Sequence, residues 1–372
     1  MALSRARLTL FAMAFLAFLL LFFPGARSVH ERYIIYSSSS SSTPKRPNGV
    51  IFMLLPPDRV RQAMLALWNV ENRFNKRLKY PYVLFMTEKE LEEVSEEDKS
   101  KIDWITEGRA KFATLTEESW EIPEFLDKSR VQHSLDHIGF SKGYRQMCRF
   151  YSGFFWRNPA LAKYDWLWRL DTDIEFHCDI TYDPIQRMID ANKLYGFIQV
   201  APDADWVQPS LASNVSHFLA THKHMVPPDA NQGFVWRGEE GIRTAMNGEG
   251  GNDEWTRMCM YNNFEISHRK VWESEIYTKF FEFLEQAGGF FYERWSDSPV
   301  HSFGLAMSLR KDQVMQFTDM GYQHQGWGYE CPLLPHCTCA KEGVAADFYD
   351  NADRLVVQRH GAPKLKKALW PA

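Results

Sequence analysis

Apolar runs that alternate with helical patterns constrain the fold of this chain most strongly. Residues 50–55 read VIFMLL, a continuous apolar run of strand length that is typical of a strand buried on both faces of a parallel sheet. After Pro56 and Pro57, apolar residues recur at helical spacing through residues 60–74, and a second apolar run follows at residues 82–86. This order predicts a β-α-β unit.

The same alternation continues along the chain. Residues 88–101 are strongly charged and predict a solvated helix, whereas residues 111–115 and 164–170 predict two more strands. Strands that alternate with helices indicate an α/β fold with a mainly parallel central sheet. In such sheets, ligands bind beyond the carboxyl ends of the strands.

Composition and charge exclude several classes of protein. The 372 residues include 43 Lys and Arg against 47 Asp and Glu, a formal net charge of -4, so no excess of positive charge is available to bind nucleic acid. Hydrophobic residues at 45% and charged residues at 24% are typical of a globular protein and exclude wholesale disorder. The aromatic share of 15% is high, which suits either an aromatic core or stacking on sugars.

The N-terminal residues predict a membrane protein of the secretory pathway. Residues 8–26 form an almost entirely apolar segment at the short end of what crosses a bilayer, and we predict that it is a signal anchor. Because Arg5 and Arg7 precede this segment, residues 1–7 are expected in the cytosol and the remainder in the lumen. A cleaved signal peptide is the alternative, although the apolar run exceeds the usual length of a signal-peptide core.

A linker is expected between the anchor and the folded body. Residues 27–49 contain six consecutive serines and two prolines and predict a flexible stem, so the lumenal domain is expected to span residues 50–372. In an oxidising lumen the six cysteines predict disulfides, without a choice of pairing. Cys331, Cys337 and Cys339 lack the paired spacing of a structural zinc site, so we predict a disulfide staple in the C-terminal loop.

A candidate metal site follows the fourth predicted strand. Asp171 and Asp173 come directly after the strand sequence WLWRL, so both carboxylates can turn toward one pocket. Carboxylate oxygens suit Mn²⁺ or Mg²⁺, and such an ion would neutralise the leaving diphosphate of a sugar nucleotide. A turn or a helix cap is the ordinary alternative for an acidic pair of this kind.

Several longer motifs give this acidic pair a context. They are, in chain order, YRQMCRFYSGFF at 144–155, YDWLWRLDTDIEFHCDITYDP at 164–184, YGF at 195–197, NFEI at 263–266, GGFFYERWSDSPVHS at 288–302 and DMGYQH at 319–324. Together they resemble the fungal Golgi α-1,2-mannosyltransferases, in the order that this family has them. The resemblance covers residues 50–339, about the whole predicted lumenal domain.

The resemblance implies a single-pass type II Golgi membrane enzyme with a GT-A-like head. Such an enzyme takes mannose from GDP-mannose with Mn²⁺ and retains the α configuration. Asp171, Asp173 and His324 match the family's metal-binding positions, and Asp173 is equally suited to orienting the site. Glu265 matches the carboxylate proposed as nucleophile, which could form a covalent intermediate or stabilise an oxocarbenium-like transition state.

Other matched residues are implied to bind substrates. Tyr144 and Arg145 match a stretch that lines the donor site, where a phenol and a guanidinium can donate to diphosphate or sugar oxygens. Arg169 could reach the nucleotide or pair with a carboxylate. Asp297 is expected to contact sugar hydroxyls, and Trp295 to stack on a pyranose.

The resulting prediction is transfer of mannose to a mannose-ended glycan in protein glycosylation or cell-wall mannan synthesis, within a possible transferase complex. A catalytically weak glycan-binding or assembly subunit is the alternative. It is favoured by Asp171-Thr172-Asp173, where the family has Glu-Pro-Asp, and by Pro56-Pro57, where the family has an arginine-asparagine pair. A secretory glycosidase also uses paired acids but requires neither metal nor nucleotide. Residues 207–260 form a divergent, glycine-rich loop, so acceptor choice is the property most expected to differ.

Overall fold

The computed structural model describes residues 46–325, 328–332, 334–338 and 343–344. The predicted tail, anchor and most of the predicted stem, up to residue 45, lie outside the described residues. Within the described ranges, no helix combines the length and the apolar composition needed to cross a membrane. The folded body begins slightly before the predicted residue 50, because the Asn48 carbonyl already accepts the backbone N–H groups of Asp165 and Trp166.

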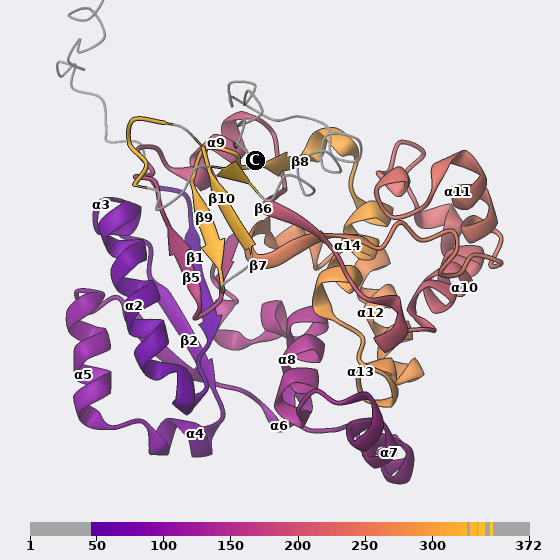
Figure 1. The fold of residues 1–372 in the computed structure, drawn as a ribbon, viewed down its shortest axis with the longest axis horizontal. Coiled ribbons are helices and arrows are strands. Elements are labelled where there is room, and N and C mark those ends of the chain that lie inside the picture. Colours follow the sequence, from indigo (N-terminus) through magenta and orange to yellow (C-terminus); the bar gives the residue numbers. More distant parts are fainter. Residues whose placement is uncertain (1–45, 326–327, 333, 339–342, 345–372) are drawn as a thin grey trace, which may run out of the picture. The chain divides into compact units, whose positions relative to one another are not determined.

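A seven-stranded sheet forms the centre of the folded body, with strand order β3-β2-β1-β4-β7-β6-β8 (Figure 1). Four neighbouring pairs, β1 with β2, β2 with β3, β1 with β4 and β6 with β8, are parallel, whereas β7 is antiparallel to both β4 and β6. The predicted α/β fold with a mainly parallel sheet is therefore confirmed. The strands are β1 (Gly49–Leu54), β2 (Tyr82–Met86), β3 (Ala110–Thr114), β4 (Trp166–Leu170), β6 (Tyr195–Pro202), β7 (Met258–His268) and β8 (Val314–Gln316).

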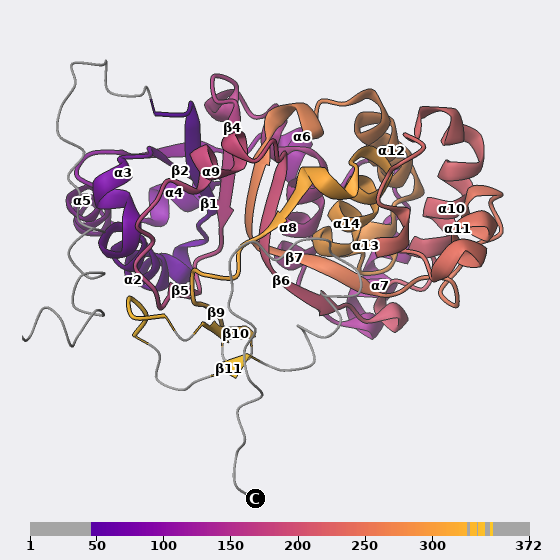
Figure 2. The same ribbon diagram turned by 90° about the horizontal axis from the view of Figure 1, so that it is seen from above.

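Different helices cover the two faces of this sheet (Figure 2). In β1, Ile51 and Met53 pack against α2 (Val60–Val70), α5 (Glu96–Ile105) and α9 (Pro184–Asp190). Val50 and Phe52 point to the other face, where α8 (Lys142–Gly153), α12 (Glu275–Ala287) and α14 (Asp297–Ser308) lie. Because successive side chains of a strand alternate, an unbroken apolar run such as VIFMLL supplies both layers.

The helical pattern after β1 is confirmed and extends further than predicted. α2 continues through a π-helical turn, Glu71–Asn75, into α3 (Lys76–Leu78). The predicted charged helix is two helices, α4 (Glu88–Glu93) and α5, because Thr87 caps the first and Ser95 caps the second.

The segment between β6 and β7 corrects a prediction. Residues 207–260, which were predicted to form a loop, contain two helices, α10 (Leu211–His222) and α11 (Gly238–Met246). The two helices pack on each other. The remaining helices are α6 (Glu117–Trp120), α7 (Lys128–Ile138) and α13 (Gly289–Tyr292).

A second, four-stranded sheet has the order β11-β10-β9-β5, with antiparallel pairs. Its strands are β5 (Ile174–Phe176), β9 (Tyr322–His324), β10 (Gly328–Cys331) and β11 (Gly343–Val344). β5 follows β4 almost directly, so this sheet brings C-terminal residues to the carboxyl end of β4.

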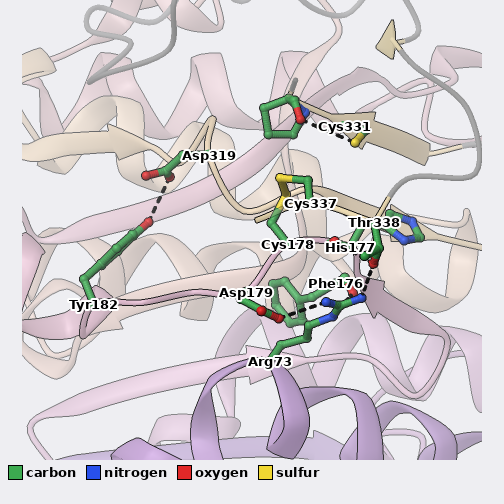
Figure 3. Close-up of a disulfide and its surroundings, with 11 residues drawn as sticks. Arg73, Phe176, His177, Cys178, Asp179, Tyr182, Asp319, Cys331, Cys337 and Thr338 are labelled. Carbon is green, nitrogen blue, oxygen red and sulfur yellow. Dashed lines mark hydrogen bonds and ion pairs between the residues drawn. A yellow bond between two sulfur atoms is a disulfide. The ribbon is translucent and has the colours of Figure 1, made fainter. Parts of the chain in front are cut away.

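A disulfide fastens the C-terminal segment beside β5 (Figure 3). Cys178 is bonded to Cys337, and Arg73 donates to both Asp179 at 2.9 Å and Thr338 at 2.6 Å. Cys331 is also disulfide-bonded, so the predicted C-terminal staple is confirmed. The expectation that every cysteine forms a disulfide is wrong for two buried free thiols, which belong to Cys148 and Cys259.

Candidate metal centre and catalytic site

Two carboxylates and an imidazole converge at the carboxyl end of β4. One potential ligand atom from each of Asp171, Asp173 and His324 lies within 4.8 Å of the others. His324 Nε2 is 3.1 Å from Asp173 Oδ1 and 3.9 Å from Asp171 Oδ2. The three residues predicted as metal ligands are therefore brought together by the fold.

Strand pairing explains how residues so far apart in the sequence meet. Asp171 leaves β4 with its backbone N–H bonded to the Asn263 carbonyl of β7 at 3.1 Å. Asp173 immediately precedes β5, and Ile174 at the start of β5 pairs with His324 at the end of β9. The metal site therefore depends on the second sheet as well as on β4.

The surroundings of Asp173 favour its ionised form. Burial by itself raises the pKa of Asp173, but hydrogen bonds from His324 and Gln325 and the charge of Arg59 outweigh it and lower the pKa to about 2. Asp171 differs, because burial raises its pKa despite the opposing charge of Arg169. Asp173 is thus the more strongly anionic of the two carboxylates.

Arg59 is a residue of this site that sequence reasoning missed. It ends a short 3-10 helix, Pro57–Arg59, directly after β1, and its Nη1 lies 3.2 Å from Asp173 Oδ2. Nearly half of the side chain, 46%, remains exposed. Its place at the carboxyl end of a parallel strand was the signal that could have identified it.

Arg169 connects the metal site with α14. Its Nε donates to Asp171 at 3.1 Å, its Nη1 donates to Asp297, and its guanidinium stacks 3.4 Å above the Tyr151 ring. Burial tends to lower the pKa of Arg169, but Asp171 and Asp297 outweigh it and raise that pKa. Of the two predicted roles for Arg169, the structure shows pairing with carboxylates.

Glu265 lies in the interior between the sheet and α14. It is directly opposite Arg169 in the pairing of β7 with β4, and its side chain is fully buried. Oε2 accepts from the Tyr195 hydroxyl at 3.0 Å and lies 2.9 Å from His301 Nδ1. Oε1 is also buried but has no hydrogen-bond partner among the described residues. Tyr195 lay within a matched motif, but sequence reasoning assigned it no role.

A bulge between β6 and β7 sets the direction of Glu265. Phe197 pairs with Glu265, but Gln199, two residues later on β6, pairs with Tyr261, four residues earlier on β7. β7 therefore carries two extra residues in this interval, which is the behaviour of an enlarged β-bulge.

The extra residues change which side of the sheet each side chain reaches. Asn262 donates to Asp297 of α14 at 3.0 Å, whereas Asn263 accepts from Tyr322 of β9 at 2.7 Å. Strict alternation from Asn263 would send Glu265 toward β9 as well, yet Glu265 contacts His301 of α14. The bulge thus lets β7 direct Asn263 toward β9, which carries His324, and both Asn262 and Glu265 toward α14.

Arg145 occupies a structural position. It is fully buried, and its two terminal nitrogens donate to Ser134 and to the carbonyls of Gly139, Phe291 and Glu293. Both terminal nitrogens are therefore committed to the protein, and the residue is fully buried, which argues against the expected contact with the donor. Its neighbour Tyr144 is only partly buried and lies 3.5 Å from Arg294 Nη1.

Trp295 also departs from its expected role. The ring is 1% exposed, and a Cβ added at Gly289 would come within 2.0 Å of it. Its Nε1 donates to Glu293 at 2.7 Å, and Phe290 packs edge-on against it. No face is open for stacking on a pyranose, so the structure corrects that prediction. Asp297 is buried as well, and it accepts hydrogen bonds from Arg169 and Asn262 beside the interior that holds Glu265.

An open pocket lies beside the segment that follows β1, and its charged lining residues are Asp58, Lys89, Glu90, Glu93, Glu121 and Lys142. Its volume is about 460 Å³, and it is lined by residues that follow β1 and β2, including Pro57 and Thr87, and by Trp120 and Gln146. This is the edge at which parallel sheets of this kind bind ligands.

Comparison with known proteins explains this geometry. The family model described as glycolipid 2-alpha-mannosyltransferase matches residues 28–360. The chain belongs to this family. The resemblance inferred from the motifs is therefore confirmed, and the protein is a member of a mannosyltransferase family.

Relatives within the family cover most of the chain. An "O-glycoside alpha-1,2-mannosyltransferase homolog 3" of Schizosaccharomyces pombe is 35% identical over 323 residues, which is 82% of this chain and 82% of that protein. "Glycolipid 2-alpha-mannosyltransferase 1" of Candida albicans is 36% identical over 275 residues, 72% of this chain and 60% of that protein.

Two solved structures share the fold. Core-mannan synthase A of Aspergillus fumigatus, in an Mn/GDP form, matches with a TM-score of 0.75 at 27% identity, over 85% of this chain and 87% of that one. The mannosyltransferase Ktr4p of S. cerevisiae, in complex with GDP, matches with a TM-score of 0.74 at 26% identity, over 84% and 83% of the two chains. The fold is GT-A-like, as predicted.

Proposed function

We propose that the protein is a retaining α-1,2-mannosyltransferase that moves mannose from GDP-mannose to a mannose-ended glycan. The observation that carries the proposal is the convergence of Asp171, Asp173 and His324 at the carboxyl end of β4. The Mn/GDP form of core-mannan synthase A and the GDP complex of Ktr4p support the choice of metal and nucleotide.

The three residues fit a divalent metal ion. Two carboxylates and one imidazole form a mixed oxygen and nitrogen donor set that suits Mn²⁺. Asp173 is held in its anionic form, as a metal ligand requires. When bound, the ion would offset the negative charge of the nucleotide diphosphate.

The pocket beside β1 and β2 is the proposed nucleotide site. Asp58 lines this pocket, and the half-exposed guanidinium of the next residue, Arg59, can donate to phosphate oxygens. Arg59 thus offers a positive charge near the place where the family's arginine-asparagine pair is replaced by Pro56-Pro57. We propose that the protein still binds the nucleotide donor despite this replacement.

Glu265 is the proposed catalytic carboxylate. Tyr195 and His301 hold one oxygen, and the second oxygen is buried with no hydrogen-bond partner in the described structure. A buried oxygen that lacks a partner is costly unless a ligand compensates it, which suits a carboxylate that meets positive charge developing at the anomeric carbon. Covalent attack and electrostatic stabilisation both use this placement.

The acceptor and location follow from the relatives and the sequence. Relatives named for O-glycoside and glycolipid mannosyl transfer support a mannosylated glycan as acceptor, in protein glycosylation or mannan synthesis. We further propose a Golgi lumenal catalytic domain anchored by residues 8–26, with a transferase complex as a possible setting.

The test is mannose transfer by the full chain in detergent from GDP-mannose to methyl α-mannoside, with and without Mn²⁺. We expect an α-1,2-linked disaccharide only with Mn²⁺, and Glu265→Gln should lower turnover by about 10²-fold or more. Glu282→Gln is the matched control, since that side chain is 60% exposed.

The other outcomes are equally informative. A folded protein that binds GDP and mannosides without transferring mannose would favour the glycan-binding subunit instead. Failure to bind GDP would reject the transferase proposal. Metal-independent hydrolysis of mannosides would indicate a glycosidase.

A further inference from the structure

A cluster of exposed aromatic and paired charged residues lies beside the catalytic interior and has no role in the proposed chemistry. We call Phe140, Asp203, Trp206 and Arg294 the Arg294 rim. Phe140 precedes α8, Asp203 and Trp206 follow β6, and Arg294 precedes α14. These residues come from three separate parts of the chain, so only the folded protein assembles this cluster.

Arg294 is the centre of the rim. Its Nη2 donates to Asp203 at 3.2 Å, its guanidinium lies 4.6 Å from the centre of the Phe140 ring, and its backbone N–H donates to the Val207 carbonyl at 2.8 Å. The residue is 5% exposed, and its Nε has no hydrogen-bond partner among the described residues. The buried Nε of Arg294 is therefore a donor that a ligand oxygen could satisfy, next to a terminal nitrogen that lies only 3.5 Å from the Tyr144 hydroxyl.

The rim is continuous with the catalytic interior. Arg294 precedes Asp297 by three residues, and its Nη1 lies 3.5 Å from the Tyr144 hydroxyl. Asp297 in turn accepts hydrogen bonds from Arg169 and Asn262 beside the interior that holds Glu265. A ligand that enters past Tyr144 would therefore contact Arg294 at its outer end.

Two exposed aromatic residues flank Arg294: Phe140, whose ring the guanidinium contacts, and Trp206, which precedes the Val207 carbonyl that accepts from the Arg294 backbone N–H. Phe140 is 44% exposed and Trp206 is 67% exposed, which is high for aromatic residues at the edge of a buried site. Phe140 also has a φ of 62°, in the left-handed region that bulky residues rarely adopt. Such conformations persist where the surrounding structure enforces them, often at ligand-binding sites.

The charges of the rim select a neutral ligand. Arg294 pairs with Asp203, and the adjoining Arg257 pairs with Asp205 at 2.8 Å, so positive and negative groups balance. The two carboxylates would repel a phosphate, and an apolar ligand would displace water from these partly exposed charged groups without replacing its hydrogen bonds. A sugar offers both apolar C–H faces for the aromatic rings and hydroxyls for the guanidinium and carboxylates.

We propose that the Arg294 rim binds the acceptor glycan at a mannose unit beyond the one that receives the new sugar. Trp206 and Phe140 stack on pyranose faces, and Asp203 and Arg294 bind vicinal hydroxyls. This inference rests on the proposed transferase function for the identity of its ligand. It makes the rim the determinant of acceptor length.

The test compares the affinity of the full chain for α-1,2-mannotriose and for methyl α-mannoside by calorimetry, with GDP and Mn²⁺ present throughout. Trp206→Ala should weaken mannotriose binding about five- to tenfold, the equivalent of roughly 1–1.4 kcal/mol, and should leave methyl α-mannoside binding almost unchanged. Trp104→Ala is the matched control, because Trp104 is 70% exposed on α5.

A second variant separates binding from folding. Phe140→Gly removes the strained φ, so it should leave the free energy of unfolding equal or higher while mannotriose binding weakens. A purely structural role for Phe140 would instead lower stability without a selective effect on the longer ligand.

Two results would overturn the inference: no binding of mannotriose by the unmodified protein, or equal mannotriose affinities for Trp206→Ala and Trp104→Ala. The proposed function fails separately. If no mannose is transferred but mannotriose binding still depends on Trp206, the rim stands and the transferase proposal does not.

Discussion

Arg169 on β4 and Asp297 at the start of α14 form an ion pair almost wholly out of solvent, with side-chain exposures of 2% and 5%. Arg169 also donates to Asp171, so this pair joins the helical layer to the metal site. Breaking a buried pair by removing one partner leaves the other charge uncompensated, which is far more costly than losing a surface pair.

We therefore expect Arg169→Met to lower the free energy of unfolding by about 3–5 kcal/mol. The matched control, Arg310→Met, removes an exposed pair with Asp312 and should cost less than about 1 kcal/mol. Urea unfolding measures both. Equal losses for the two variants would show that the buried pair does not contribute in this way.

Metal binding should stabilise the folded protein through His324. A ligand that binds only the native state at roughly 100 times its dissociation constant adds about 2.7 kcal/mol. Mn²⁺ should therefore raise the melting temperature, and EDTA should reverse the shift. His324→Ala should abolish the Mn²⁺ shift, whereas His217→Ala, an exposed position on α10, should keep it. A full Mn²⁺ shift in His324→Ala would place the ion elsewhere.

The Cys178–Cys337 disulfide should support the metal site as well as the fold. It lies beside β5, which pairs with the strand that carries His324. We expect Cys178→Ser with Cys337→Ser to cost about 2–5 kcal/mol in unfolding free energy and to weaken Mn²⁺ binding. Reduction of the unmodified protein, followed by mass spectrometry to count thiols, is the independent check. Undiminished Mn²⁺ affinity in the double variant would limit the disulfide to a stabilising role.

Gly153 on α8 should not tolerate a side chain. A Cβ there would lie 2.0 Å from the ring of Phe281, which is buried. Alanine gains about 1 kcal/mol in helix propensity, but overpacking typically costs about 1–3 kcal/mol, so Gly153→Ala should be destabilising on balance. Gly233→Ala, where nothing lies within 4 Å of the added atom, should change stability by less than about 0.5 kcal/mol. Thermal unfolding of both variants distinguishes the two cases.

Apolar runs predicted β1, β2, β3 and β4, because strands buried on both faces keep a simple signal. β7 escaped prediction because its sequence MCMYNNFEISH mixes polar and apolar residues, and its bulge breaks the two-residue period. The helices between β6 and β7 were hidden by glycine-rich segments, which resemble a loop.

The fold brings the three predicted metal ligands together, whereas it buries Arg145 and Trp295. A shared motif shows which residues recur, whereas burial decides which of them can touch a ligand. Backbone carbonyls accept hydrogen bonds from Arg145, and Gly289 and Phe290 pack against the ring of Trp295. Arg59 lies outside the quoted motifs, and only its position after the first predicted strand could have identified it from the sequence.

Because of the bulge in β7, the position of Glu265 depends on how many residues precede it in the strand as well as on which residues they are. Deletion of a single residue between Cys259 and Glu265 would shift the pairing of the strand by one residue. Glu265 would then point to the opposite face of the sheet. The length of this interval therefore matters as much as the hydrogen bonds that Asn262 and Asn263 make within it. The segment between β6 and β7 lies outside this pairing, so a change in its length would leave the spacing that directs Glu265 unchanged.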